Sequence, residues 1–239
     1  MGDGPHMNIA QTIADRLGRR IIRGDLQTDG TTLIEQDIVS EFSASRNVVR
    51  EAVKTLAGKN LVRSERRVGT IVQPPTEWNL LDPQVIQWML TEEKTHDELL
   101  RALSEMRLIF EPEAAALAAE RATSRQVLRI FDCFEEMKRH ANDPEKAIEY
   151  DVMFHVAVLD ACGNPLLRSL NQSISLLLRA NFKLSIQVDN AFIRNLVDHG
   201  LIAEAIHEKS PERARQATID LLKKNESDIH AIKAAGNIG

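Results

Sequence analysis

The order of elements in the first third of the chain is the feature that most constrains its fold. Apolar residues recur every four positions from Ile9 to Ile21, which predicts an amphipathic helix that ends at Gly24. A short apolar helix over 34–42 and a longer helix over 45–59 follow. Two β-type runs, LVRS and TIVQ, then flank a basic turn and predict a β-hairpin. Three helices and a hairpin with a basic tip form the order of a winged helix-turn-helix.

Adjacent prolines separate this region from the rest of the chain. Because proline cannot continue a strand or enter a helix interior, the segment PPTEWN predicts a linker. The segments after the linker all have helical periodicity, which predicts a bundle of six or seven helices. We therefore expect a mostly α chain with a cloning remnant at 1–7, a winged helix-turn-helix DNA-binding domain at 8–73, a linker at 74–82 and an all-helical effector-binding and dimerisation domain at 83–234.

Composition excludes several classes of protein. The 239 residues include two cysteines, which excludes a disulfide framework or a cysteine zinc cluster and suits a reducing compartment. No apolar run approaches the roughly 20 residues that span a bilayer, so we expect a cytoplasmic protein without a membrane partner. Although the net charge is −5, the segment from Arg46 to Arg67 carries 7 basic and 2 acidic residues. This local excess of positive charge favours nucleic acid as a partner.

The helix predicted over 45–59 contains the residues that base recognition requires. Arg46 and Arg50 lie one turn apart near its start, and an arginine can hold guanine O6 and N7 with two hydrogen bonds. Asn47 can bind adenine in a similar way. Ser45 and the helix N-terminus can hold a phosphate. The pattern predicts a recognition helix in the major groove of double-stranded DNA.

The predicted hairpin adds further contacts with DNA. Arg66 and Arg67 at its tip can reach the DNA backbone or the minor groove, and Gly69 allows a close approach. A single short helix reads too few bases to be specific. We therefore expect a homodimer that binds a palindromic operator.

The helical region contains a second candidate site. Asp151 and His155 stand at i and i+4, so both side chains project from one helix face and could bind one cation. An ordinary ion pair is the commoner role of such a pair. His199 lies on a later helix that is otherwise apolar. Arg107, on a helix of mostly apolar or small residues, either extends to solvent or lines a polar cavity.

The run from Thr32 to Val72 resembles the DNA-binding domain of GntR-type bacterial transcription regulators. Its Ser-Arg, Val-Arg-Glu-Ala and Gly-Thr motifs are intact. Where the family has Leu-Pro-Ser-Glu-Arg this chain reads TLIEQ, so Gln36 stands at the position of a DNA-contacting arginine, which implies an altered contact or operator. The helical region resembles the FCD ligand domain of FadR-type members. The two resemblances together cover nearly the whole chain.

The FCD resemblance implies a set of metal ligands. These domains have Asp-x-x-x-His on one helix, a histidine on the next but one and a final histidine on the last. The correspondence gives Asp151, His155 and His199, with Leu221 at the last position. Three ligands can hold one Zn²⁺, Ni²⁺ or Mn²⁺, with water or an effector oxygen completing the coordination. Alternatively the histidines bind a carboxylate or hydroxyls directly, and the sequence leaves both possibilities open.

The resemblance also implies an effector. It places Arg107 against a ligand carboxylate, which a guanidinium can hold with two hydrogen bonds. Asn171 and Ser175, four residues apart on one predicted helix, are candidates for hydroxyl contacts, although a plain solvent face explains them equally well. The segment EWNLLDPQVIQWML is similar to regulators of sugar-acid use, which implies an effector such as galactonate or gluconate.

We therefore expect a repressor of a sugar-acid catabolic operon that a carboxylate effector releases from DNA. An enzyme is the main alternative, because an aspartate, two histidines and a metal could activate water in a hydrolase that acts on a small acid derivative. No nucleophile motif, phosphate loop or HExxH supports it, so we expect no enzymatic activity. A nucleoid-type DNA binder without an effector is the third interpretation.

Overall fold

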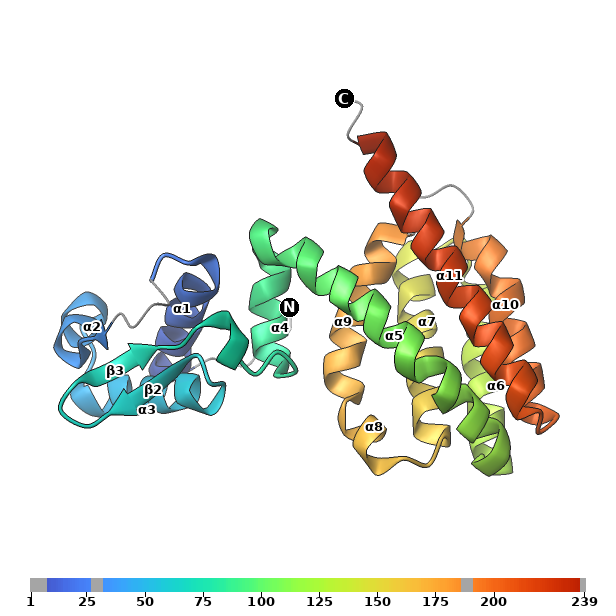
Figure 1. The fold of residues 1–239 in the computed structure, drawn as a ribbon, viewed down its shortest axis with the longest axis horizontal. Helices are drawn as coiled ribbons and strands as arrows, with labels where there is room; N and C mark the ends of the chain where they lie inside the picture. The colour runs from blue at the N-terminus through green and yellow to red at the C-terminus, as the bar shows by residue number, and fades with distance from the viewer. Residues whose placement is uncertain (1–7, 27–31, 186–190, 237–239) are drawn as a thin grey trace. The chain divides into compact units, whose positions relative to one another are not determined.

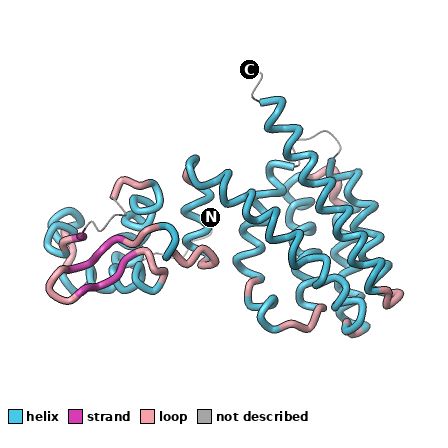
Figure 2. Tube along the Cα trace, in the orientation of Figure 1, coloured by secondary structure: helices cyan, strands magenta, loops and turns pink. Residues whose placement is uncertain are grey.

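The computed structural model describes residues 8–26, 32–185 and 191–236, and the chain divides into two compact units, residues 1–97 and 98–239. No helix in these described ranges has the length and apolar character needed to cross a membrane. The mostly α fold class predicted from the sequence is confirmed, with a small three-stranded sheet in the first unit (Figures 1 and 2).

Three helices form the body of the first unit: α1 (Ile9–Arg23), α2 (Glu35–Phe42) and α3 (Arg46–Gly58). From Ile13 to Ile21 the apolar stripe of α1 is buried, as its four-residue period predicts, and α1 packs against α3, whereas Ile9 at the start of the stripe is exposed. Asn8 begins α1 with a capping box, and Gly24 ends it in the left-handed conformation at φ 84°.

The wing follows α3. The predicted hairpin is confirmed as β2 (Val62–Glu65) and β3 (Gly69–Val72), and β1 (Thr32–Leu33) adds a third strand in the antiparallel order β1-β3-β2. A two-residue strand is too short to show a period, so the sequence did not reveal β1. At Gly69 the backbone φ is 120°, and a Cβ atom would lie 2.9 Å from Cγ2 of Thr32. Glycine at this position therefore allows the close packing of β1 on the hairpin.

The helix after the predicted linker belongs to the first unit. A short 3-10 helix (Pro75–Glu77) leads to α4 (Pro83–Thr91), whose Trp88 is fully buried against α1. The Trp88 indole Nε1 donates to Asp15 Oδ1 at 2.7 Å. A Cβ atom at Gly18 would lie 2.4 Å from this indole, so the glycine makes room for the ring. The units therefore divide after Asp97, within α5, rather than at the predicted boundary at residue 83.

The second unit is a helical bundle. Its helices are α5 (Glu93–Arg121), α6 (Ser124–Arg139), α7 (Pro144–Ala161), α8 (Pro165–Ser169), α9 (Asn171–Ser185), α10 (Ala191–His207) and α11 (Pro211–Gly236). The helical periodicity after Pro165 predicts one continuous helix there, but the structure has the pair α8 and α9. Nothing in the sequence at this break is a helix breaker, which is why periodicity extended across it.

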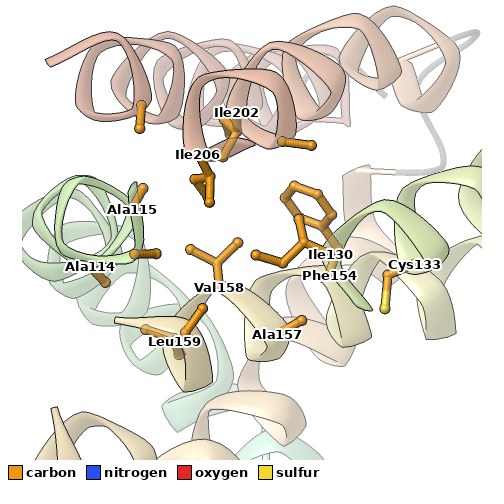
Figure 3. Close-up of a cluster of buried hydrophobic side chains, with 14 of the residues drawn as sticks. Ala114, Ala115, Ile130, Cys133, Phe154, Ala157, Val158, Leu159, Ile202 and Ile206 are labelled. Carbon is orange, nitrogen blue, oxygen red and sulfur yellow. The ribbon is translucent and has the colours of Figure 1, made fainter. Parts of the chain in front are cut away.

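The core of the bundle surrounds α7. Figure 3 shows apolar side chains of α5, α6, α7 and α10 that gather around Val158 and Ile206. The residues of α7 that are buried lie on more than one face, and α7 contacts both α6 and α9. Because its neighbours cover the helix, Asp151 and His155 on α7 are removed from solvent. Their burial sets the chemistry of the site.

Candidate functional site

The start of α3 presents the predicted base-reading residues. Ser45 caps the helix by accepting a hydrogen bond from the backbone N–H of Val48 at 3.4 Å. Arg46, Asn47 and Arg50 are exposed, whereas the opposite face of α3 is buried in the first unit. The structure therefore leaves these three side chains accessible to a large ligand.

Two side chains of α2 contact the arginines of α3. Glu35 accepts a hydrogen bond from Arg50 Nε at 3.2 Å. Gln36 Oε1 accepts one from Arg46 Nη2, also at 3.2 Å. Gln36, which the GntR resemblance places at an arginine position, thus contacts Arg46 of α3, the predicted recognition helix. The partner of Arg50 is on α2 and not its chain neighbour Glu51, so each arginine is held by an acceptor of the preceding helix.

The tip of the hairpin carries the remaining predicted contacts. Arg66 and Arg67 are both exposed, and Arg67 has a left-handed backbone with φ 67°. Val68 alone separates them from Gly69, the first residue of β3. The geometry fits a basic wing tip that can approach a phosphate backbone.

A buried polar cluster lies in the second unit and consists of Arg107, Glu111, Asp151, His155 and His199. Each is at most 5% exposed, and they come from α5, α7 and α10. Asp151 Oδ1 lies 3.3 Å from His155 Nε2 and 3.1 Å from His199 Nε2. The three predicted metal ligands therefore converge, with one ligand atom of each within 4.8 Å of the others.

The contacts behind the two histidines orient their rings. His199 Nδ1 lies 2.7 Å from the backbone carbonyl of Asn195, and His155 Nδ1 lies 2.9 Å from Glu111 Oε2. Both partners are acceptors, so each Nδ1 donates and each Nε2 is directed at Asp151. Metal-bound histidines have this arrangement. Two imidazole nitrogens and a carboxylate oxygen that face one another fit a divalent cation such as Zn²⁺, Ni²⁺ or Mn²⁺. Leu221, fully buried on α11, supplies no ligand.

Arg107 and Glu111 form a bidentate pair one helical turn apart. Arg107 Nε donates to Glu111 Oε1 at 2.6 Å, and Nη2 donates to Oε2 at 3.3 Å. The same Nη2 lies 3.3 Å from His155 Nε2. Although burial raises the pKa of Glu111, the positive charges of Arg107 and His155 lower this pKa to about 2. Glu111 was not predicted from the sequence, although its i,i+4 spacing from Arg107 was an available signal.

The cluster has an unbalanced charge when both histidines are neutral. Burial raises the pKa of Asp151, but His199 and His155 together hold it below its usual range, so this carboxylate is ionised. Burial lowers the pKa of His155, whereas the charge of Glu111 and the hydrogen bonds to Asp151 and Glu111 raise it overall. One guanidinium against two carboxylates leaves one negative charge, which a proton on histidine or a bound cation must balance.

The two predicted hydroxyl contacts make their hydrogen bonds elsewhere. Asn171 Nδ2 donates to Asp160 Oδ1 of α7 at 2.7 Å, and Ser175 Oγ donates to the backbone carbonyl of Asn171 at 2.7 Å. The structure therefore does not join them to the polar cluster. Asn181, farther along α9 and 2% exposed, instead lines a small cavity with Arg107. The sequence feature that could have identified Asn181 as buried is its position three residues after Leu178, on the buried stripe of α9.

Comparison with known proteins finds a family match in each of the two units. Residues 9–72 match the family described as bacterial regulatory proteins, gntR family, and residues 102–224 match the FCD domain. The galactonate operon transcriptional repressor of Escherichia coli K12 is 35% identical over 227 residues, which cover 95% of this chain and 99% of the repressor. YieP, an uncharacterised HTH-type transcriptional regulator of the same strain, is 32% identical over 218 residues, 90% of this chain and 93% of YieP.

Solved structures agree with these matches. A GntR protein of Streptococcus agalactiae shares 26% identity and a TM-score of 0.51, and the match covers 91% of this chain and 99% of that one. Lar, which controls expression of the Listeria monocytogenes agr system, has a TM-score of 0.64 at 17% identity over 95% of this chain and 99% of its own, a likeness of fold alone. Proteins with these domains are transcriptional regulators and not enzymes. The chain belongs to the GntR family of DNA-binding transcriptional regulators and carries an FCD effector-binding domain.

Proposed function

We propose that the protein is a homodimeric repressor of a sugar-acid catabolic operon, released from a palindromic operator when a carboxylate effector binds the polar cluster. The observation that carries the proposal is a buried guanidinium, Arg107, beside three converging side chains that could hold a metal ion. The likeness to the galactonate operon repressor supports a sugar acid as the effector.

The charges of the polar cluster suit a cation and a carboxylate together. With neutral histidines the cluster has one negative charge, and a divalent cation changes this to one positive charge. A bound carboxylate then brings the site to neutrality, which a buried site requires. A cation held by Asp151, His155 and His199 would act as a Lewis acid toward the effector's oxygens, while Arg107 would orient the carboxylate through its planar donors.

Release from DNA requires that the effector prefer the arrangement that cannot bind the operator. The coupling is limited to the difference in effector affinity between the two arrangements, about 1–3 kcal/mol, or a 5- to 150-fold change. Arg107 and Glu111 lie on α5, the helix within which the two units divide. A shift of this pair therefore acts on the helix that links the effector domain to the DNA-binding unit.

The effector prediction can be tested on operator DNA selected from a random library by the wild-type protein. We expect galactonate, gluconate or a related sugar acid to weaken operator binding by roughly 5- to 150-fold in fluorescence anisotropy. Non-operator DNA serves as the control, because a general effect of ionic strength would weaken both equally. If no sugar acid changes operator affinity, the proposed effector class is wrong.

The metal prediction requires a separate measurement. After dialysis against a chelator and reloading with Zn²⁺, Ni²⁺ or Mn²⁺, we expect about one ion per chain by elemental analysis. Asp151→Asn should lower the metal affinity by 10-fold or more, because it removes a charged ligand. Asp160→Asn is the matched control, since Asp160 lies on the same helix but contacts Asn171. Equal metal content in the two variants would instead favour direct binding of the acid by the histidines.

A further inference from the structure

The buried asparagine Asn181 in the helical unit has a side-chain oxygen that accepts no hydrogen bond. Asn181 on α9 is 2% exposed, and its Oδ1 has no hydrogen-bond partner among the described residues. A buried acceptor without a donor costs free energy that the folded protein ordinarily avoids. An uncompensated acceptor therefore marks a place where a donor from outside the chain can bind.

This asparagine lines a cavity that contains the other parts of a polar subsite. The cavity has a volume of about 10 Å³, and its other polar lining residues are Ser104 and Arg107 of α5 and Asn225 and Glu226 of α11. A cavity of about this volume holds one group of the size of a water molecule. Asn225 Oδ1 accepts a hydrogen bond from Asn195 Nδ2, which fixes the Asn225 side chain. Arg107 donates to Glu111 through Nε and Nη2, and the same Nη2 lies 3.3 Å from His155 Nε2, so these contacts fix the guanidinium beside the cavity.

The Arg107–Glu111 pair lies between this cavity and a second one. The second cavity, also about 10 Å³, is lined by Glu111 and His155 together with mostly apolar side chains. Arg107 faces the asparagine cavity, and Glu111 faces the cavity next to the predicted metal ligands. A ligand whose carboxylate is held at Arg107 thus has a polar, water-sized space on the side of Asn181.

We propose that Asn181 is a specificity-determining residue that accepts a hydrogen bond from a hydroxyl group of the effector, with Asn225 as the second polar wall of this hydroxyl subsite. The inference rests on the proposed function, because it requires a carboxylate anchored at Arg107. It adds the residue that distinguishes a hydroxylated acid from a plain one.

A hydroxyl group suits this subsite better than other groups of the same size. Its hydrogen can be donated to Asn181 Oδ1, and its oxygen can accept from Arg107 or from the Asn225 amide. A methyl or methylene group would leave the Asn181 oxygen unpaired. A second carboxylate would bring acceptor oxygens against an acceptor. The hydroxyl subsite therefore selects hydroxylated monocarboxylates over aliphatic acids and dicarboxylates.

The test compares acids of equal chain length on the full-length protein by calorimetric titration. The probes are galactonate and gluconate, each with six carbons and several hydroxyls, and hexanoate, with six carbons and none. We expect the wild-type protein to bind at least one hydroxy acid 10-fold or more tightly than hexanoate. In Asn181→Leu this preference should fall by 10-fold or more, through weaker binding of the hydroxy acid alone.

Asn171→Leu is the matched control. Asn171 lies on the same helix and also has a buried Oδ1 without a partner, but it lines neither of the two cavities beside the Arg107–Glu111 pair. We expect the Asn171→Leu variant to prefer the hydroxy acid over hexanoate as strongly as the wild-type protein does. The ligand-free unfolding temperature of Asn181→Leu should not fall, since the change removes an unpaired buried oxygen. If this variant does not fold, Asn181→Ala gives the same comparison.

Each remaining outcome identifies which proposal fails. If Asn181→Leu keeps the wild-type preference, or if both asparagine variants lose it equally, the hydroxyl subsite is wrong while the carboxylate effector stands. If the wild-type protein binds hexanoate as tightly as the hydroxy acids, the subsite is again wrong. If it binds none of these acids, the carboxylate effector and the subsite are both overturned.

Discussion

Arg50→Ala is expected to weaken operator binding by about 2–6 kcal/mol, or roughly 30-fold to more than 10⁴-fold. One bidentate arginine–guanine contact contributes about 1–3 kcal/mol of discrimination, and a homodimer makes this contact twice. Arg50 is exposed at the start of α3, where Glu35 of α2 orients its guanidinium. Fluorescence anisotropy on DNA selected by the wild-type protein measures the loss.

Lys54→Ala is the control for this substitution. Lys54 lies one turn later on α3, where it pairs with Glu51. Its substitution removes one positive charge from the same helix, as Arg50→Ala does. A lysine that contacts only phosphate should cause a smaller loss, equal on operator and random DNA. Arg50→Ala should instead lower the affinity for operator DNA and leave the affinity for random DNA unchanged. Normal operator binding by Arg50→Ala would contradict the assignment of α3 as the recognition helix.

The elements of the fold that the sequence predicted are those with a long local signal. α1 and α3 each have an apolar stripe over several turns, and the hairpin has two β-type runs around a basic turn. The break between α8 and α9 and the strand β1 have no such signal. Local patterns also could not predict that α4 packs in the first unit. Its position depends on the burial of Trp88 in the space that Gly18 leaves on α1.

The candidate site was predicted in part for the same reason. Asp151 and His155 are one turn apart on one helix, so their spacing predicts a shared face, which the structure has. His199 joins them from another helix, and the resemblance to FCD domains, rather than any period, indicated it. Glu111 and Asn181 were missed because their roles depend on which helix face is buried. That information comes from packing between helices and not from residue type.

Arg107→Leu is expected to lower the free energy of unfolding by about 3–5 kcal/mol, because it leaves the Glu111 carboxylate buried without its cation. For a chain of this size the corresponding fall in unfolding temperature is roughly 6–20 °C. The double variant Arg107→Leu with Glu111→Leu should recover most of this loss, since replacing both partners of a buried pair by apolar groups is often neutral. Scanning calorimetry, which resolves separate domain transitions, provides the measurement.

The control is the partly exposed pair Arg215–Glu113, which also joins an arginine to a glutamate of α5 with two hydrogen bonds. Solvent screens this pair, so Arg215→Leu should shift the transition far less than Arg107→Leu. A stable double variant also separates folding from effector binding, because it lacks the guanidinium that we propose as the anchor of the carboxylate. It should bind operator normally and show no release by a sugar acid. Release of DNA by the acid from this folded variant would contradict the role of Arg107 as the carboxylate anchor.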